Sequence, residues 1–140
     1  MNILLAVDGS PYTKKMLAYL VTHPELFGPH NRFTVFTATA ALPPRARSAV
    51  GADVAHGYYE EEATKVDAPV LEFLGRHGIT PQVVHAVGHA GEQIARAATE
   101  GNFDLVLMGS HGHGALANLV MGSVATQVLA HCKVPVLLVR

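Results

Sequence analysis

The chain has 140 residues, of which 49% are hydrophobic and 15% charged, and its formal net charge is −1. This composition is typical of one compact globular domain and excludes a disordered chain. No run of Lys or Arg stands out, which argues against nucleic acid as the main partner. The opening MNILLAVDGS carries no charged leader, and its apolar run is too short to span a membrane. With one cysteine, Cys132, no disulfide framework is possible within the chain. We therefore expect a cytoplasmic protein with a single domain, residues 1–140.

The chain begins with a predicted strand and helix. The apolar run at residues 3–7 stops at the turn Asp8-Gly9-Ser10 and predicts a strand buried on both faces, as in parallel sheets. Ser10 and Pro11 suit an N-cap and a first helical position, so we expect a helix that ends around residues 24–28.

The middle of the chain predicts a strand, a loop and a long helix. Residues 33–39 are β-branched and aromatic and predict the strand, whereas residues 40–56 show no periodicity and predict a long loop. Residues 58–76 predict a helix. Pro69 lies inside it and is expected to break or kink it, because proline lacks the N–H for an intrahelical bond and crowds the preceding turn.

The remaining elements complete an alternating pattern. Strands are predicted at residues 83–87, 105–108 and 136–139, and helices at residues 90–100 and 123–131. The order β-α-β-α-β-α-β-α-β is typical of an α/β fold with an open five-stranded parallel sheet, helices on both faces and right-handed crossovers.

The stretch GSHGHGALANLVMGS, residues 109–123, is the best candidate for a binding site. It begins at the end of a buried strand, where open α/β sheets bind ligands. Its glycines allow backbone amides to approach an anion, and the helix that starts near Gly122-Ser123 offers free N–H groups and a positive dipole end. The spacing is neither that of a P-loop nor GxGxxG. On the residues alone, the stretch is either a phosphate cradle or a turn that only connects strand to helix.

The histidines and the cysteine indicate no second site. His85 and His89 are four residues apart but lie at a strand end, and neither Cys-x-x-Cys nor His-Glu-x-x-His occurs, so we expect no metal site. Cys132 is expected to be a small buried residue at the end of the last helix. We assign no catalytic residue.

The segment DLVLMGSHGHGALANLVMGSVATQVLAHCKVPVLLVR resembles the C-terminal signature of universal stress proteins of the ATP-binding branch. That branch carries Gly-x-x-Gly, nine residues, and then Gly-Ser or Gly-Thr. Here Gly109 and Gly112 are followed by nine residues and then Gly122-Ser123. The opening ILLAVDGS is similar to the family's first strand and its acidic residue, and the resemblance covers residues 2–140.

The resemblance implies a Rossmann-like fold with strand order 3-2-1-4-5. It also implies an adenine nucleotide (ATP, ADP or AMP) at the carboxyl edge of the first and fourth strands, with Mg²⁺ or Mn²⁺ bridging its phosphate oxygens. Asp8 would bond the ribose hydroxyls, the main chain near Ala38 would face the adenine, and Met108 and Gly109 would flank the ribose. Main-chain amides would hold the phosphates at Gly112, Gly122, Ser123 and Val124, and Ser123 would also cap its helix.

The chain departs from the family pattern in its charge. Many members carry Arg directly after the second glycine and a basic residue further on, where this chain has His113 and Asn118. Arginine pairs bidentately with phosphate, which a largely neutral histidine does not do. The preference for ATP over AMP is therefore open. Arg45 and Arg47, in the predicted loop, either reach ligand phosphates or lie on the surface.

The resemblance also implies a regulatory or stress-response protein that dimerises through its last strand, within PVLLVR, with no membrane partner. Two other functions stay open. One is a weak ATPase or a nucleotide-dependent transferase, for which only His111 and His113 lie near the phosphates in sequence. The other is an interaction module without nucleotide, in which the glycine stretch is purely structural.

Overall fold

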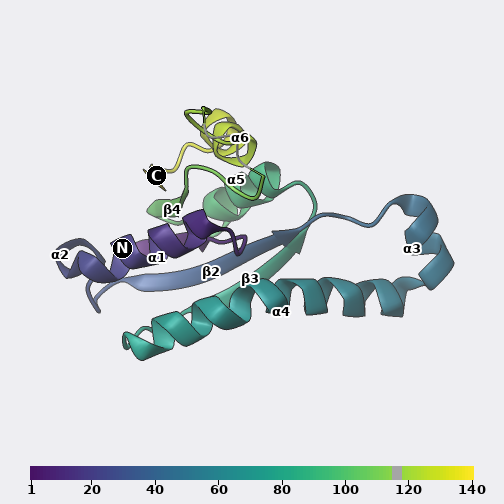
Figure 1. Ribbon diagram of the computed structural model, residues 1–140, viewed down its shortest axis with the longest axis horizontal. Coiled ribbons are helices and arrows are strands. Elements are labelled where there is room, and N and C mark those ends of the chain that lie inside the picture. Colours follow the sequence, from purple (N-terminus) through teal and green to yellow (C-terminus); the bar gives the residue numbers. More distant parts are fainter. Residues whose placement is uncertain (115–117) are drawn as a thin grey trace.

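A computed structural model describes residues 1–114 and 118–140 and shows an α/β fold built on one parallel sheet (Figure 1). The strand order is β3-β2-β1-β4-β5, and each neighbouring pair is parallel. The fold class and the strand order expected from the sequence are therefore confirmed. The strands are β1 (Asn2–Ala6), β2 (Arg32–Thr39), β3 (Gln82–Val87), β4 (Leu105–Gly109) and β5 (Val136–Val139).

The central strands are apolar on both sides because helices cover both faces of the sheet. Side chains alternate along a strand, so Leu5 of β1 packs into one core and Leu4 into the other. Leu5 pairs in register with Val35 of β2 and with Leu107 of β4, and all three are fully buried.

Two pairs of helices form the outer layers, as Figure 1 shows. α1 and α4 pack on one face of the sheet, and α5 and α6 on the other. Within the described residues, no helix combines the length and the apolar composition needed to cross a membrane. The helices are α1 (Pro11–Thr22), α2 (Pro24–Phe27), α3 (Pro44–Val50), α4 (Ala52–Arg76), α5 (Ala90–Glu100) and α6 (Ser123–His131).

The start of α1 is as predicted. Ser10 is its N-cap, with Oγ accepting from the Thr13 amide at 3.4 Å, and Pro11 is the first helical residue. The first amides of a helix need acceptors, and a capping side chain supplies one of them. This cap stabilises the turn that follows the carboxyl end of β1.

The prediction of a loop at residues 40–56 is wrong, because α3 lies there and α4 already begins at Ala52. Every residue of α3 is exposed, so this helix has no buried face and no apolar period that a sequence could show. Pro44 occupies the first position of α3, where proline favours a helix. In Figure 1, α3 and the adjacent end of α4 project beyond the sheet.

Of the break or kink expected at Pro69, the break is wrong, because α4 continues through this residue as one helix of 25 residues. Pro69 and Lys65, whose carbonyl loses its intrahelical partner, are both exposed, so water can satisfy that carbonyl. Val66 before Pro69 packs against the core, as do the buried Val70 and Leu74 after it, so α4 is held to the sheet on both sides of the lost bond.

Candidate functional site

A cavity of about 280 Å³ opens at the carboxyl edge of the sheet, where the chain switches from adding strands on one side of β1 to adding them on the other. Open parallel sheets bind ligands at such a switch point, because the loops of adjacent strands leave in opposite directions. The structure brings all eight site residues named from the sequence to the lining of this cavity, namely Asp8, Ala38, Met108, Gly109, Gly112, Gly122, Ser123 and Val124.

Asp8 follows β1 and uses its two carboxylate oxygens differently. Oδ1 accepts from the Ser10 amide and from the Thr13 hydroxyl, each at 2.9 Å, which orients the side chain. Oδ2 lies 2.8 Å from the position that a Cβ on Gly112 would occupy, so it faces the glycine loop. One oxygen therefore holds the turn, and the other is available to a ligand that donates hydrogen bonds.

Unpaired amides gather where the glycine loop meets α6. Within the described residues, no acceptor is paired with the amides of Gly112, Ser123 or Val124. The amide of Gly122 differs from the expectation, because it donates to the Ser110 carbonyl at 2.7 Å and is not free for a phosphate. Unpaired amides at the start of a helix attract anions. The amides available to an anion at the start of α6 are therefore those of Gly112, Ser123 and Val124.

The structure also corrects the expected N-cap of α6. Gly122, not Ser123, is the N-cap, and Ser123 is the first helical residue. Gly122 has a φ of −76°, which any residue adopts, so a positive φ is not the reason for a glycine here. Residues 115–117, which belong to the nine-residue spacer of the motif, lie outside the described residues.

The two histidines of the glycine loop bond to main-chain carbonyls. His113 Nε2 donates to the Asp8 carbonyl at 2.7 Å and so joins the loop to the end of β1. His111 Nε2 donates to the Leu119 carbonyl at 2.8 Å, and its Nδ1 accepts from the Ser110 hydroxyl at 2.8 Å. A carbonyl only accepts, so Nε2 carries the proton in both rings. Both histidines line the cavity, but the protein itself uses their Nε2–H groups.

The β2 side of the cavity is apolar. Phe36 and Ala38 of β2 line it together with Ala90 and Ile94 of α5. An apolar surface on one side and unpaired amides on the other suit a ligand with a hydrophobic ring and an anionic group. Sequence reasoning named only Ala38 here. The apolar period of α5 indicates a buried face but not which strand that face covers.

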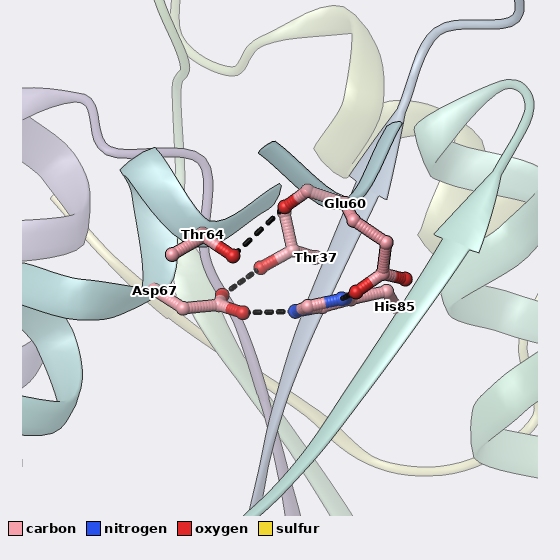
Figure 2. Close-up of polar contacts among 5 residues, drawn as sticks. All are labelled: Thr37, Glu60, Thr64, Asp67 and His85. Carbon is pink, nitrogen blue, oxygen red and sulfur yellow. Dashed lines mark hydrogen bonds and ion pairs between the residues drawn. The ribbon is translucent and has the colours of Figure 1, made fainter. Parts of the chain in front are cut away.

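A second polar cluster lies on the other face of the sheet (Figure 2). The buried Asp67 of α4 accepts from the Thr37 hydroxyl of β2 at 2.5 Å and from His85 Nε2 of β3. Glu60, earlier in α4, places Oε2 3.7 Å from His85 Nδ1. Within the described residues, no group of three His, Cys, Asp or Glu is arranged to hold a metal ion. The cluster joins α4 to two strands and lines no part of the cavity, since Thr37 and Ala38 point to opposite faces.

Comparison with known proteins places the chain among its relatives. The model of the Universal stress protein family matches residues 1–140. The chain belongs to the universal stress protein family. Universal stress protein Slr1230 of Synechocystis sp. is 33% identical over 139 residues, which are 99% of this chain but 42% of that protein. A universal stress protein of Thermus aquaticus is 31% identical over 146 residues, covering 99% of this chain and 98% of that protein.

Solved structures of universal stress proteins share the fold. MJ0577 of Methanocaldococcus jannaschii superposes with a TM-score of 0.79 at 23% identity, over 99% of this chain and 94% of that one. A universal stress protein in complex with cAMP gives 0.69 at 20% identity, over 100% and 97% of the two chains. One from Archaeoglobus fulgidus in complex with dAMP gives 0.64 at 20% identity, over 100% and 98%.

In this universal stress protein, the small room left for a side chain explains the three glycines of the motif. A Cβ on Gly109 would lie 2.6 Å from the Cβ of Tyr12. On Gly112 it would lie 2.8 Å from a carboxylate oxygen of Asp8, and on Gly122 it would lie 3.1 Å from the Cα of His111. Each position is a close approach between the loop and another segment, so a larger residue would displace the lining of the cavity.

Proposed function

We propose that this universal stress protein binds an adenine nucleotide (ATP, ADP or AMP) in the cavity at the carboxyl edge of the sheet. In this proposal it acts as a regulatory or stress-response module. The observation that supports it is the arrangement of the cavity, which combines apolar residues of β2 and α5, the free oxygen of Asp8, and the unpaired amides at the start of α6. A base, a sugar and a phosphate require these three kinds of surface. Universal stress proteins of the same fold have been solved in complex with cAMP and with dAMP, which supports an adenine nucleotide as the ligand of this chain.

The site residues have distinct roles in this proposal. Asp8 Oδ2 accepts hydrogen bonds from the ribose hydroxyls, the main chain near Ala38 faces the adenine, and Met108 and Gly109 flank the ribose. The amides of Gly112, Ser123 and Val124 donate to a phosphate, while Gly122 provides the close approach between loop and helix. A Mg²⁺ or Mn²⁺ ion would be held mainly through phosphate oxygens, because Asp8 is the one carboxylate in the described lining.

Direct binding measurements test this function. Isothermal titration calorimetry of purified protein with AMP, ADP and ATP, each with and without Mg²⁺, should show saturable binding of at least one of them. GMP is the control and should bind more weakly. Mass spectrometry of the ligand released on denaturation should detect an adenine nucleotide carried through purification. If no adenine nucleotide binds at millimolar concentration, the cavity is not a nucleotide site, and the interaction module without nucleotide becomes the better interpretation.

A further inference from the structure

The described lining of the cavity offers no fixed positive charge. Its titratable side chains in the described part of the chain are Asp8, His111 and His113. The whole stretch 109–123 contains no Lys or Arg, and its residues 115–117 are Ala, Leu and Ala. The one formal charge on the described lining is therefore the negative charge of Asp8.

Basic residues of neighbouring elements do not line the described cavity. The Lys15 ammonium group lies 4.7 Å from the centroid of the Tyr12 ring, where an aromatic face already stabilises it. Arg45 and Arg47 belong to α3, which projects beyond the sheet (Figure 1). Arg140 follows β5 and is exposed. The side chains that could neutralise an anion are thus placed elsewhere.

The unpaired amides where Gly112 meets the start of α6 suit a single phosphate. The Gly112 amide nitrogen lies 3.6 Å from the position that a Cβ on Gly122 would take, so it stands close to the start of α6. The unpaired amides of Ser123 and Val124 follow directly in that helix. The Nε2–H groups of the two cavity histidines already donate to carbonyls, at 2.8 and 2.7 Å. A second or third phosphoryl group would find neither a cation nor one of these ring donors.

We propose, resting on the nucleotide binding proposed above, that the cavity selects a nucleoside monophosphate over a free triphosphate. A triphosphate binds with comparable affinity only when a divalent cation neutralises its outer phosphates. A phosphate monoester carries about −1.5 to −2 charges at neutral pH, and each further phosphoryl group adds to that charge. Amides and a helix end stabilise the first phosphate, whereas Asp8 repels the others and no side chain of the described lining compensates. His113 is then a specificity-determining residue, since it lines the cavity directly after Gly112 and carries no fixed charge there.

Calorimetric titrations of the wild-type protein at constant ionic strength test the selectivity. With EDTA present, AMP should bind at least about tenfold more tightly than ATP, the difference that roughly 1.4 kcal/mol represents. Saturating Mg²⁺ should strengthen ATP binding and leave AMP binding unchanged. ATP binding as tight as AMP binding in EDTA would overturn the inference and leave the proposed function intact. Failure of every adenine nucleotide to bind would overturn the proposed function and this inference with it.

A matched pair of variants tests the cause. His113→Arg adds a cation at the loop and should strengthen ATP binding in EDTA by about tenfold, with a smaller effect on AMP. His113→Gln keeps a donor for the Asp8 carbonyl without adding charge and should retain the preference for AMP. AMP binding by both variants shows that the cavity is intact. Equal ATP affinity of the two variants in EDTA would contradict a preference set by the missing cation.

Discussion

At Gly122, α6 begins so close to the glycine loop that a side chain would crowd the loop's backbone. A Cβ there would lie 3.1 Å from the Cα of His111 and 3.3 Å from the Ser110 carbonyl oxygen, and backbone atoms cannot move aside easily. We expect Gly122→Val to displace the loop and abolish AMP binding, at a cost of about 1–3 kcal/mol in the free energy of unfolding. Calorimetry measures the binding, and circular dichroism checks the folding.

Gly75→Val is the matched control for this substitution. Gly75 is exposed in α4, where an added Cβ would meet no atom within 4 Å beyond its chain neighbours and the adjacent backbone of the helix. This variant should bind AMP as the wild type does. If folded Gly122→Val also bound AMP normally, the glycine loop would be a structural turn and not a phosphate cradle.

The carboxylate of Asp8 is predicted to recognise the sugar. In Asp8→Asn the amide oxygen can still accept from Ser10 and Thr13, so the turn after β1 should be kept. The loss of Oδ2 removes an acceptor for ribose hydroxyls, and we expect the affinity for AMP to fall about tenfold. The affinity for 2′,3′-dideoxy-AMP should not fall, because that nucleotide has no hydroxyls to lose. Equal weakening of both nucleotides in calorimetry would rule out the sugar role.

At the scale of elements, the buried Asp67 joins α4 to β2 and β3 (Figure 2). Asp67 accepts hydrogen bonds from Thr37 and His85, so Asp67→Ala leaves donors from two strands without their acceptor. We expect the free energy of unfolding to fall by about 2–4 kcal/mol, measured by urea denaturation. Glu60→Gln is the control, since Glu60 is 55% exposed and should contribute less than about 1 kcal/mol. An Asp67→Ala variant as stable as Glu60→Gln would show that the cluster does not hold α4 in place.

For the whole molecule, β5 leaves one edge of the sheet open, and we expect dimerisation there. The Pro135 carbonyl accepts from Val106 of β4 and the Val139 carbonyl from Ser110 directly after β4. The alternating residue Leu138 therefore directs its main-chain N–H outward. An open edge of this kind pairs readily with a second copy through a two-fold axis. Light scattering should detect a dimer at micromolar concentration.

Substitutions at Leu138 distinguish pairing of the strand edge from a loss of side-chain packing. Leu138→Pro removes the outward N–H and should give a monomer, whereas Leu138→Ala shortens the side chain but keeps the N–H and should still dimerise. A Leu138→Pro variant that dimerises as well as Leu138→Ala would place the interface elsewhere. A monomeric wild type would exclude the dimer.

Local patterns in the sequence determined the strands of this protein, the start of its first helix and the glycines of its binding loop. Each strand is an apolar or β-branched run with turn residues at its end, so the bounds of all five lie within one residue of those predicted. Ser10 and Pro11 determine the start of α1 through their own chemistry. The spacing of Gly109, Gly112 and Gly122 is likewise visible in the sequence, because close approaches of the main chain restrict a position to glycine. These features depend on residues that are near one another in the chain.

The tertiary structure decided what depends on contacts between distant residues. α3 has no buried face and therefore no apolar period, and α4 continues through Pro69 because its other face packs on the sheet. The bond from His113 to the Asp8 carbonyl joins residues 105 positions apart, and Asp67 meets His85 across 18. Hydrogen-bond partners of this kind follow from how helices dock on strands. No local pattern specifies that docking, because many arrangements bury a similar apolar area.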